Sequence, residues 1–283
     1  MLELLFAAFL GLVQGLTEFL PVSSSGHLAV FQELWIWAGG DPALLDEQVA
    51  FNLVLHVGTL LPVLVMYRGD IGAAFSDIRG QGPLLSRPGL RLAAWVIVGT
   101  IPTGIIGLSL KDVFEQLFGS IGMVGIAFAV TGALLYRTRT LPVGKLEVAE
   151  MTWKHALIIG LAQGFAITPG ISRSGTTIAV AIMLGLRRDL AARYSFLLSV
   201  PAILGAFVLE ARHLDLSTSH SVAPLLVGFV VAALSGWGAL VVLLKLVKTG
   251  DFSRFAWYLW PLAGLATAFW ALRSAGVLPL VLG

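Results

Sequence analysis

Long apolar stretches constrain this chain more than any other feature of its sequence. Six of them are long enough, or nearly so, to cross a hydrocarbon core, which needs about 20 helical residues. They cover residues 51–67, 91–110, 119–136, 194–211, 222–244 and 256–273. Of the 283 residues, 57% are hydrophobic and only 12% are charged. This composition predicts an all-α polytopic membrane protein and excludes a soluble domain.

Four shorter apolar pieces form two pairs, and each pair is interrupted by proline, glycine and a polar string. The pieces cover about 2–19, 24–38, 155–168 and 174–186. The first string is Gln14-Gly-Leu-Thr-Glu-Phe-Leu-Pro-Val-Ser-Ser-Ser-Gly-His27, and the second is Gln163-Gly-Phe-Ala-Ile-Thr-Pro-Gly-Ile-Ser-Arg-Ser-Gly-Thr-Thr177. Non-helical backbone at membrane depth is tolerated only where protein or a water-filled cavity satisfies its polar groups. Each pair is therefore predicted to form a re-entrant helical hairpin whose polar turn is buried.

The order of these elements predicts an inverted-topology repeat within a single integral membrane domain, 1–283. Three full spans separate the hairpins, and an odd number of crossings places the second hairpin on the opposite membrane face. The first repeat covers 1–140, with hairpin 2–38 and three spans; the second covers 150–283, with hairpin 155–186 and three spans. A gapless alignment of 11–26 with 160–175 supports a duplication, because seven of sixteen positions match.

The distribution of lysine and arginine gives an independent indication of orientation. Fourteen of these residues fall on the face opposite both termini: Arg68, Arg79, Arg87, Arg91, Arg137, Arg139, Lys145, Lys154, Arg187, Arg188, Arg193, Lys245, Lys248 and Arg254. The terminal face receives three, Lys111, Arg212 and Arg273, and Arg173 lies within the membrane. By the positive-inside rule, both termini and the mouth of the first hairpin are predicted to lie outside the cytoplasm.

Other compositional features exclude several classes of site and partner. The formal net charge of +2 is too small to suggest nucleic acid. Cysteine is absent, so disulfides and thiolate metal sites are excluded. The sequence from Met1 to Leu5 has no basic segment, which argues against a cleaved signal peptide.

The polar strings have the chemistry of an anion site. Each string ends in serines and glycine at the predicted start of a helix, where unpaired N–H groups and the helix dipole favour a phosphate. Arg173 adds a permanent charge whose planar fork fits phosphate oxygens. The residues expected to contact a phosphate or diphosphate are Gln14, Ser23, Ser25, Gly26, Ser172, Ser174, Gly175 and Thr177.

The first string also supplies groups that catalysis of phosphoryl transfer requires. Glu18 is expected to bind a divalent cation, because such a cation commonly joins a carboxylate to substrate phosphates. His27 is expected to transfer a proton, and a serine, with Ser24 as the candidate, could act as the nucleophile. Together with Arg173, these residues suggest phosphoryl transfer or hydrolysis.

Less specific interpretations compete with each of these assignments. The hydroxyl groups could serve helix capping and packing alone, and Glu18 and Arg173 could form a purely structural ion pair. His56 lies in a predicted span, where it could line the same cavity, although we expect a hydrogen-bonded core histidine there. Inverted repeats with broken helices are also frequent in transporters, so a transporter or flippase of an anionic polyprenyl-phosphate lipid is the main alternative function. A structural scaffold would leave the buried charges unexplained.

Two motifs resemble those of a known family. Glu18-Phe-Leu-Pro-Val-Ser-Ser-Ser-Gly-His27 and Pro169-Gly-Ile-Ser-Arg-Ser-Gly-Thr-Thr177 are similar to the signatures of the bacterial undecaprenyl-diphosphatase, or bacitracin-resistance, family. The resemblance extends to 51–59 and 191–204. By motif position it implies catalytic roles for Glu18, His27 and Arg173. Gln14 stands where many members have glutamate, and Asn52 where an acidic residue is frequent, so Glu18 would carry more of the metal coordination here.

The resemblance also implies a reaction and a location. It implies hydrolysis of undecaprenyl diphosphate to undecaprenyl phosphate, which recycles the carrier lipid for peptidoglycan synthesis, cell-wall biogenesis and cell shape. It further implies a divalent cation, Mg²⁺ or Ca²⁺, and a multi-pass protein of the bacterial inner membrane with a site open to the periplasmic or extracellular side. The expected partners are the lipid bilayer and a polyprenyl diphosphate. The motifs are compatible with either a serine or a metal-activated water as nucleophile, and the sequence leaves a homodimer open.

Overall fold

The computed structural model describes residues 2–39, 48–210 and 222–277, and within these ranges its regular structure is helical. The helices are α1 (Leu2–Phe19), α2 (Ser24–Trp37), α3 (Gln48–Met66), α4 (Arg68–Ile78), α5 (Pro88–Ser109), α6 (Lys111–Phe118), α7 (Ile121–Arg137), α8 (Trp153–Phe165), α9 (Arg173–Met183), α10 (Arg188–Glu210), α11 (Val222–Thr249) and α12 (Ala256–Ser274). Three short 3-10 turns and one isolated bridge, between Leu146 and Leu186, complete the described structure. The expectation of an all-α protein is confirmed.

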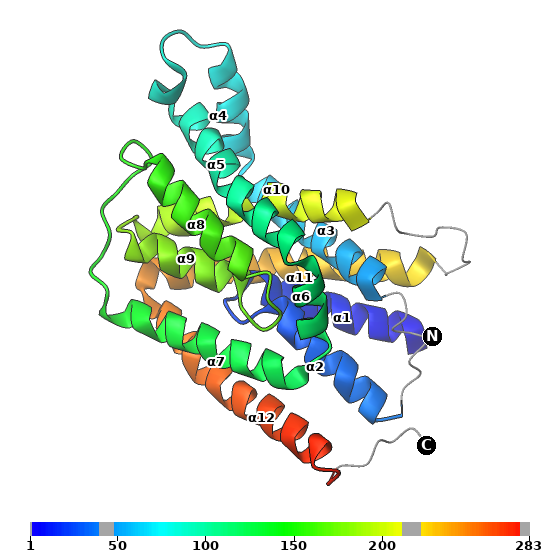
Figure 1. Ribbon diagram of the computed structural model, residues 1–283. Coiled ribbons are helices and arrows are strands. Elements are labelled where there is room, and N and C mark those ends of the chain that lie inside the picture. Colours follow the sequence, from blue (N-terminus) through cyan, green and yellow to red (C-terminus); the bar gives the residue numbers. More distant parts are fainter. Residues whose placement is uncertain (1, 40–47, 211–221, 278–283) are drawn as a thin grey trace.

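Five helical segments are long and apolar enough to cross a membrane. They are Pro88–Ser109, Ile121–Thr140, Arg188–Leu209, Val222–Thr249 and Phe252–Ser274. The remaining predicted span, 51–67, corresponds to α3. It is long and apolar enough only together with α4, and the two helices are bent by 67° at Tyr67. The chain is therefore a polytopic membrane protein. α4 and α6, short helices that were not among the predicted elements, lie in the connections between spans; α4 and the start of α5 project from the rest of the bundle (Figure 1).

The two interrupted pairs fold as helical hairpins. α1 and α2 are separated by the turn that contains Pro21, and α8 and α9 by the turn that contains Pro169 and Gly170. Proline cannot donate a helical hydrogen bond, and Gly170 has a φ of +90°, so neither turn continues the preceding helix. The hairpins enter the bundle from opposite sides, and their turns meet near its centre (Figure 1).

Long helix pairs hold the hairpins in place. α1 packs along α11, α8 packs along α5, and α7 packs along α12. Glycine allows the closest approaches: a Cβ added at Gly11 would lie 2.6 Å from the Gly228 carbonyl oxygen, and one at Gly160 would lie 2.0 Å from the Gly99 carbonyl oxygen. Small residues bring membrane helices into backbone contact, where dispersion forces hold them together. The first helix of each hairpin is thus fixed against a full span.

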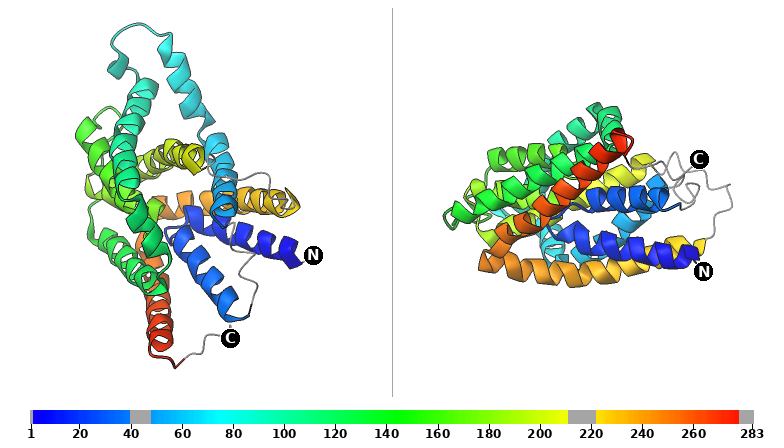
Figure 2. Two further views of the ribbon diagram at one scale, coloured as in Figure 1. Left: turned by 45° about the vertical axis from the view of Figure 1, so that its right-hand side comes forward. Right: turned by 90° about the horizontal axis from the view of Figure 1, so that it is seen from below.

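Apolar side chains divide between an aromatic core and the outer surface of the bundle. Phe19, Phe128, Tyr194 and Phe196 are fully or almost fully buried in the main cluster. An exposed stripe runs along α5, formed by Ile97, Ile101, Ile105 and Leu108. Residues at this spacing share one helix face, and a continuous apolar face on the outside of a membrane protein contacts lipid. The start of α1 and the end of α12 lie toward the same end of the bundle (Figure 2).

Candidate active site

The turns of the two hairpins are in direct contact. The Ser174 hydroxyl lies 3.5 Å from the Leu20 carbonyl oxygen, across the two turns. A Cβ added at Gly26 would lie 2.8 Å from the Gly170 Cα, and one added at Gly175 would lie 3.1 Å from the Pro21 Cβ. The two polar strings, 149 residues apart in sequence, therefore form one cluster.

The two strings share the same local structure where each second helix begins. Ser23 caps α2 by accepting a hydrogen bond from the Gly26 N–H at 3.3 Å, and Ser172 caps α9 through the Gly175 N–H at 3.1 Å. Capping satisfies the third N–H group of each helix, while helix geometry directs the first N–H groups out of the helix end. Two positive helix ends are consequently available near the contact between the turns.

One difference between the turns lies in the backbone at Ser23. Its φ of 69° is the only positive value at a non-glycine residue in the described part of the chain, whereas the matching Ser172 has a φ of −74°. A side chain in this region of backbone space costs about 1–3 kcal/mol and persists only where the surroundings impose it. The strained residue directly precedes α2, the helix that contains Ser24 and His27.

Glu18 lies at the centre of the cluster and is 7% exposed. Its Oε1 pairs with the Arg173 guanidinium across the two hairpins. Its Oε2 accepts hydrogen bonds from Gln14 Nε2 at 2.8 Å and from the Ser24 hydroxyl at 2.7 Å. The expected grouping of Gln14, Glu18, Ser24 and Arg173 is therefore present, and the ion pair of the structural interpretation is formed as well.

The Arg173 ion pair leaves part of the guanidinium without a partner. Nη2 contacts Glu18, whereas Nη1 is buried with no hydrogen-bond partner. The Thr176 hydroxyl, three residues later on the same helix face, is also buried and unpartnered. Unsatisfied buried donors are costly, roughly 1–3 kcal/mol each and more for charged groups. Such donors beside two helix N-termini fit an oxyanion ligand better than a purely structural pair.

His56 is the histidine nearest to Glu18. Its Nδ1 lies 2.7 Å from the Asn52 carbonyl oxygen, and its Nε2 lies 3.6 Å from Glu18 Oε2. Because a carbonyl only accepts, Nδ1 carries a hydrogen, and a neutral ring would then turn its Nε2 lone pair toward a carboxylate. A cation, either a proton or a metal ion, relieves that repulsion. His56 is hydrogen-bonded as expected, but it also belongs to the site.

His27 occupies a different part of the cluster from the one its sequence neighbours suggest. Its Nδ1 lies 2.8 Å from the Ser23 carbonyl oxygen, one helical turn earlier, and its Nε2 lies 2.7 Å from the Tyr258 hydroxyl on α12. The Ser24 hydroxyl donates to Glu18 instead. Activation of Ser24 by a direct hydrogen bond to His27 is therefore not the arrangement in this structure, in which Glu18 accepts the hydrogen bond of the serine hydroxyl.

The remaining predicted residues are near the contact between the turns, and they differ in how many of their hydrogen bonds are already made within the protein. The Ser23 and Ser25 hydroxyls are 3.3 Å apart, as are those of Ser172 and Ser174. Thr177 is fully buried, and its hydroxyl donates to the Arg173 carbonyl oxygen at 2.8 Å and lies 2.5 Å from the Ser195 hydroxyl. Thr177 therefore fits a packing role, and its neighbour Thr176 has the unpartnered hydroxyl.

Three residues of the cluster were not singled out from the sequence as site residues. Tyr258 contacts His27, Thr131 on α7 donates to the Gly170 carbonyl oxygen at 3.1 Å and accepts from the Ser172 N–H at 3.2 Å, and His56 approaches Glu18. Tyr258 resembles an interfacial anchor, and Thr131 resembles an ordinary small polar residue of a span. Of the three, only His56 stands out in the sequence, because it and Asn52 are polar residues within the apolar stretch 51–59.

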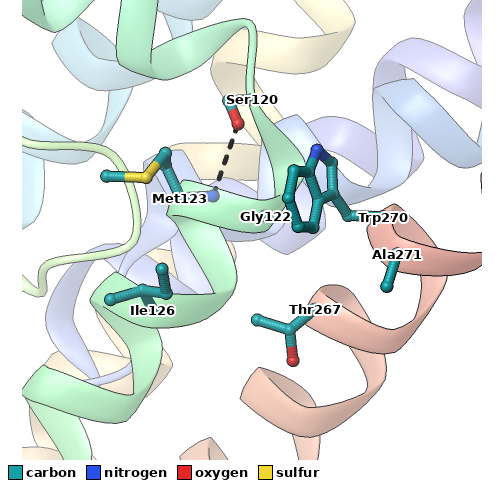
Figure 3. A pocket seen from close by; sticks show the side chains of 7 residues that line it. All are labelled: Ser120, Gly122, Met123, Ile126, Thr267, Trp270 and Ala271. Carbon is teal, nitrogen blue, oxygen red and sulfur yellow. Dashed lines mark hydrogen bonds between the residues drawn. The ribbon is translucent and has the colours of Figure 1, made fainter. Parts of the chain in front are cut away.

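Two cavities in the described part of the chain are lined by residues other than those of this cluster. One, of about 280 Å³, is formed between α7 and α12 by Ser120, Gly122, Met123, Ile126, Thr267, Trp270 and Ala271 (Figure 3). It contains no charged side chain and cannot neutralise a diphosphate. A second, of about 340 Å³, is lined by Arg193, which is paired with Asp70, and by Lys248 and Asp189. The buried charges around Glu18, and not cavity volume, identify the candidate site.

The residues around Glu18 can accommodate a divalent cation only with help from a ligand. No group of three or more histidine, aspartate or glutamate side chains suitable for a metal occurs in the described ranges. However, the amide oxygens Gln14 Oε1 and Asn52 Oδ1 are buried without partners. They precede Glu18 and His56, respectively, by one helical turn, and Mg²⁺ commonly uses one or two carboxylates together with substrate phosphates and water. The donor set therefore fits such a cation.

Comparisons with known proteins give a consistent result over most of the chain. The family model of the bacitracin resistance protein BacA matches residues 7–265. Curated proteins named undecaprenyl-diphosphatase include one from Carboxydothermus hydrogenoformans, 41% identical over 95% of this chain and 97% of that protein. Another, from Desulfosudis oleivorans, is 44% identical over 90% of this chain and 94% of its own length. A third, from Halothermothrix orenii, is 43% identical over 92% and 95%. The chain belongs to the BacA bacitracin-resistance family.

Proposed function

We propose that this protein hydrolyses undecaprenyl diphosphate to undecaprenyl phosphate and inorganic phosphate. The observation that carries the proposal is the Glu18–Arg173 pair, buried where two polar hairpin turns meet inside an apolar bundle. Curated relatives that share about 40% of their residues with this chain are named for this activity. Their names give no support to the transporter alternative.

The terminal phosphate is bound by donors from the second hairpin. Arg173 Nη1 and the Thr176 hydroxyl are buried donors without partners, and both lie in the first turn of α9. The N-terminal ends of α9 and α2 add backbone N–H groups and a favourable dipole. The Ser23 and Ser25 hydroxyls of the first turn add further groups that can bind a phosphate oxygen, while Gly26 allows the close contact with the second turn. Together these groups stabilise the charge that develops on the transferred phosphoryl group.

A divalent cation, Mg²⁺ or Ca²⁺, would be held by Glu18 with help from Gln14, His56 and Asn52. A carboxylate beside a diphosphate is repulsive unless a positive charge lies between them, and Arg173 neutralises only one negative charge. When bound, the cation neutralises phosphate oxygens and lowers the barrier to attack. The experiment is to titrate Mg²⁺ and Ca²⁺ into protein treated with a chelator. Full activity without added or residual divalent cation would contradict this part of the proposal.

Glu18 and His27 divide the proton transfers. The Ser24 hydroxyl donates to Glu18 at 2.7 Å, so Glu18 is placed to accept the proton of a nucleophile at this position, either Ser24 itself or a water molecule near it. His27 then supplies or removes a proton elsewhere in the site. The prenyl chain extends into the bilayer, because the bundle presents apolar faces to lipid.

The two halves of the chain are proposed to be inverted copies, 1–140 and 150–283. The first hairpin helix of each half packs on the second of the three spans of the other half: α1 on α11, and α8 on α5. This reciprocal packing is what a two-fold axis in the membrane plane produces. With lysine and arginine concentrated on the face opposite the termini, the mouth of the α1–α2 hairpin opens to the periplasmic or extracellular side of the cell membrane.

The activity is tested by phosphate release from a C55 or shorter prenyl diphosphate in detergent or lipid nanodiscs. We expect the wild-type protein to release phosphate in the presence of Mg²⁺ or Ca²⁺. If it releases none, the enzymatic assignment is wrong.

Arg173 provides the sharpest test of the site. Arg173→Ala is expected to reduce kcat/KM by at least about a hundredfold, because a charge-assisted contact to phosphate is removed in a water-poor site. Arg173→Lys keeps the charge but loses the fork, so it should recover only part of the activity. Arg79→Ala, at an exposed position on the same protein, is the control for loss of positive charge. Turnover equal to that of the wild type in Arg173→Ala would remove the phosphate-binding assignment.

A further inference from the structure

The two ring nitrogens of His27 have different and non-exchangeable partners. Nδ1 lies 2.8 Å from the Ser23 carbonyl oxygen, which can only accept a hydrogen bond. Nδ1 therefore carries the hydrogen, and the neutral imidazole has its lone pair on Nε2. The helix fixes this arrangement, because the carbonyl belongs to the residue that caps α2.

Tyr258 covers the only basic nitrogen of that ring. Its hydroxyl oxygen lies 2.7 Å from His27 Nε2, so the phenol donates its hydrogen to the lone pair. The two ring planes differ by only 5°, with centroids 5.7 Å apart. Phe128 meets the imidazole edge to face, with centroids 5.3 Å apart. The ring of His27 is thus held by contacts from α2, α7 and α12.

This geometry restricts how His27 can gain or lose a proton. Nδ1 is already protonated and faces a carbonyl, so an added proton must arrive at Nε2, where Tyr258 lies. A balanced transfer follows: the Tyr258 hydroxyl hydrogen moves to Nε2 while the phenol oxygen accepts a proton from a hydronium ion of the surroundings, which is left as water. In the reverse direction the imidazolium returns the proton, and Tyr258 ends unchanged. His27 is 5% exposed and Tyr258 is 50% exposed, so the phenol links a buried base to the surroundings.

We propose that Tyr258 is a positioning residue for catalysis, which holds the His27 ring with its hydrogen on Nδ1 and passes on the protons that Nε2 gains and loses during each turnover. The inference rests on the proposed function insofar as His27 exchanges a proton with the substrate. It adds a residue from the last span to a site whose recognised groups belong to the two hairpins. α12 thereby becomes part of the catalytic unit.

The competing explanation is that Tyr258 is only an aromatic anchor. It lies beside a cluster in which Tyr136 contacts Trp257 and Trp260, with ring centroids 6.1 and 5.4 Å apart. Anchoring depends on the aromatic ring, whereas the proposed role depends on the hydroxyl. Tyr258→Phe removes the hydroxyl and keeps the ring, and Tyr136→Phe makes the same chemical change within the aromatic cluster. The pair of variants separates the two roles.

Kinetics of the purified variants give the first measurement. For Tyr258→Phe we expect kcat to fall by about tenfold or more and KM to stay within about twofold, because substrate binding is untouched while general acid–base catalysis is impaired. Tyr136→Phe should retain the wild-type kcat. Equal kcat for Tyr258→Phe and the wild type would overturn the proposal, as would an equal loss in Tyr136→Phe.

A second measurement does not depend on turnover. The chain has five histidines, so ¹⁵N labelling of the imidazoles gives a spectrum in which His27 is assigned by its loss in His27→Gln. The Nε2 resonance of His27 should shift in Tyr258→Phe and stay in place in Tyr136→Phe. An unchanged resonance in Tyr258→Phe would overturn the inference even if the enzyme is active. If the wild-type protein released no phosphate, the proposed function would fail while this spectrum still decided whether Tyr258 holds His27.

Discussion

Glu18 is the residue at which the interactions of the site converge. It joins α1 to α9 through Arg173, to the start of α2 through Ser24, and to α3 through His56. Removing one member of a buried charge pair typically costs about 3–5 kcal/mol, because the other charge is left uncompensated. Substitutions at Glu18 or Arg173 therefore affect stability as well as catalysis. Residues whose replacement changes only stability or only catalysis are more informative, and Thr176 and Thr177 on α9 are such a pair.

Thr176 and Thr177 are expected to respond in opposite ways to replacement by valine, which keeps their shape. Thr176→Val removes a buried hydroxyl without a partner, so stability should stay the same or rise, while KM for the prenyl diphosphate should increase about threefold or more. Thr177→Val leaves the Ser195 hydroxyl without its neighbour and should lower stability by about 1–2 kcal/mol with KM unchanged. Thermal unfolding and steady-state kinetics measure both effects.

Each variant of this pair is the control for the other. A rise in KM for Thr177→Val with no change for Thr176→Val would reverse the assignment of the two hydroxyl groups. A loss of stability in Thr176→Val would show that its hydroxyl has a partner in the folded protein.

Local spacing accounts for the site residues that the sequence identifies. Gln14 and Glu18 are one helical turn apart, Ser24 begins the next helix, and the serine–glycine pattern repeats around Arg173, so their grouping follows from short-range geometry. Tyr258 is different, because it lies 231 residues from His27 and its neighbours suggest only a membrane anchor. Distinguishing Thr176 from Thr177 likewise requires knowing that Ser195 on α10 packs against one and not the other.

At the scale of elements, the two hairpins depend on each other at their turns. Gly26 faces Phe128 and Gly170, and Gly175 faces Pro21, so neither turn tolerates added volume. The hairpin helices were predictable because proline, glycine and polar strings interrupt otherwise apolar sequence. The predicted span 51–67 ends where α3 ends, whereas the short helix α4, bent by 67° from α3, was not predicted from the sequence.

Gly26→Ala is expected to disrupt the contact between the turns. Its Cβ would lie 2.6 Å from the Phe128 ring and 2.8 Å from the Gly170 Cα, and overpacking of this kind costs about 1–3 kcal/mol. Activity should fall by more than tenfold, because the Glu18–Arg173 pair spans the contact. Thermal stability and phosphate release are the measurements.

The matched control is Gly104→Ala in α5, where an added Cβ meets nothing within 4 Å. It should keep full activity and unchanged or slightly higher stability, since alanine favours a helix over glycine. Equal behaviour of the two variants would contradict the close packing of the turns.

At the scale of the whole molecule, the spans and the charges give one consistent orientation. Five apolar segments and the bent α3–α4 pair give an even number of crossings if each is one span, and the start of α1 and the end of α12 lie toward the same end of the bundle (Figure 2). The all-helical membrane architecture follows from the long apolar runs of the sequence. The membrane face that carries the mouth of the first hairpin is predicted from the loop charges alone, and labelling of single cysteines tests it directly.

The natural absence of cysteine makes that test simple. A single cysteine at Gln116 in α6 is expected to react with a membrane-impermeant maleimide in intact cells, because it lies on the face of the termini. A cysteine at Gln81, between α4 and α5, should react only after the membrane is opened. Both side chains are exposed, so burial does not limit labelling. The reverse pattern would place the mouth of the first hairpin in the cytoplasm.

The pairing of Glu18 with Arg173 has a consequence for how the protein is made. The two residues are 155 positions apart, and at typical synthesis rates of about 5–20 residues per second the arginine leaves the ribosome roughly 8–30 s after the glutamate. During that interval the Glu18 carboxylate of the first hairpin lacks the Arg173 guanidinium that pairs with it in the folded protein. Its stable insertion must therefore wait for the second half of the chain, and truncated nascent chains that end before α9 should leave this hairpin accessible to protease.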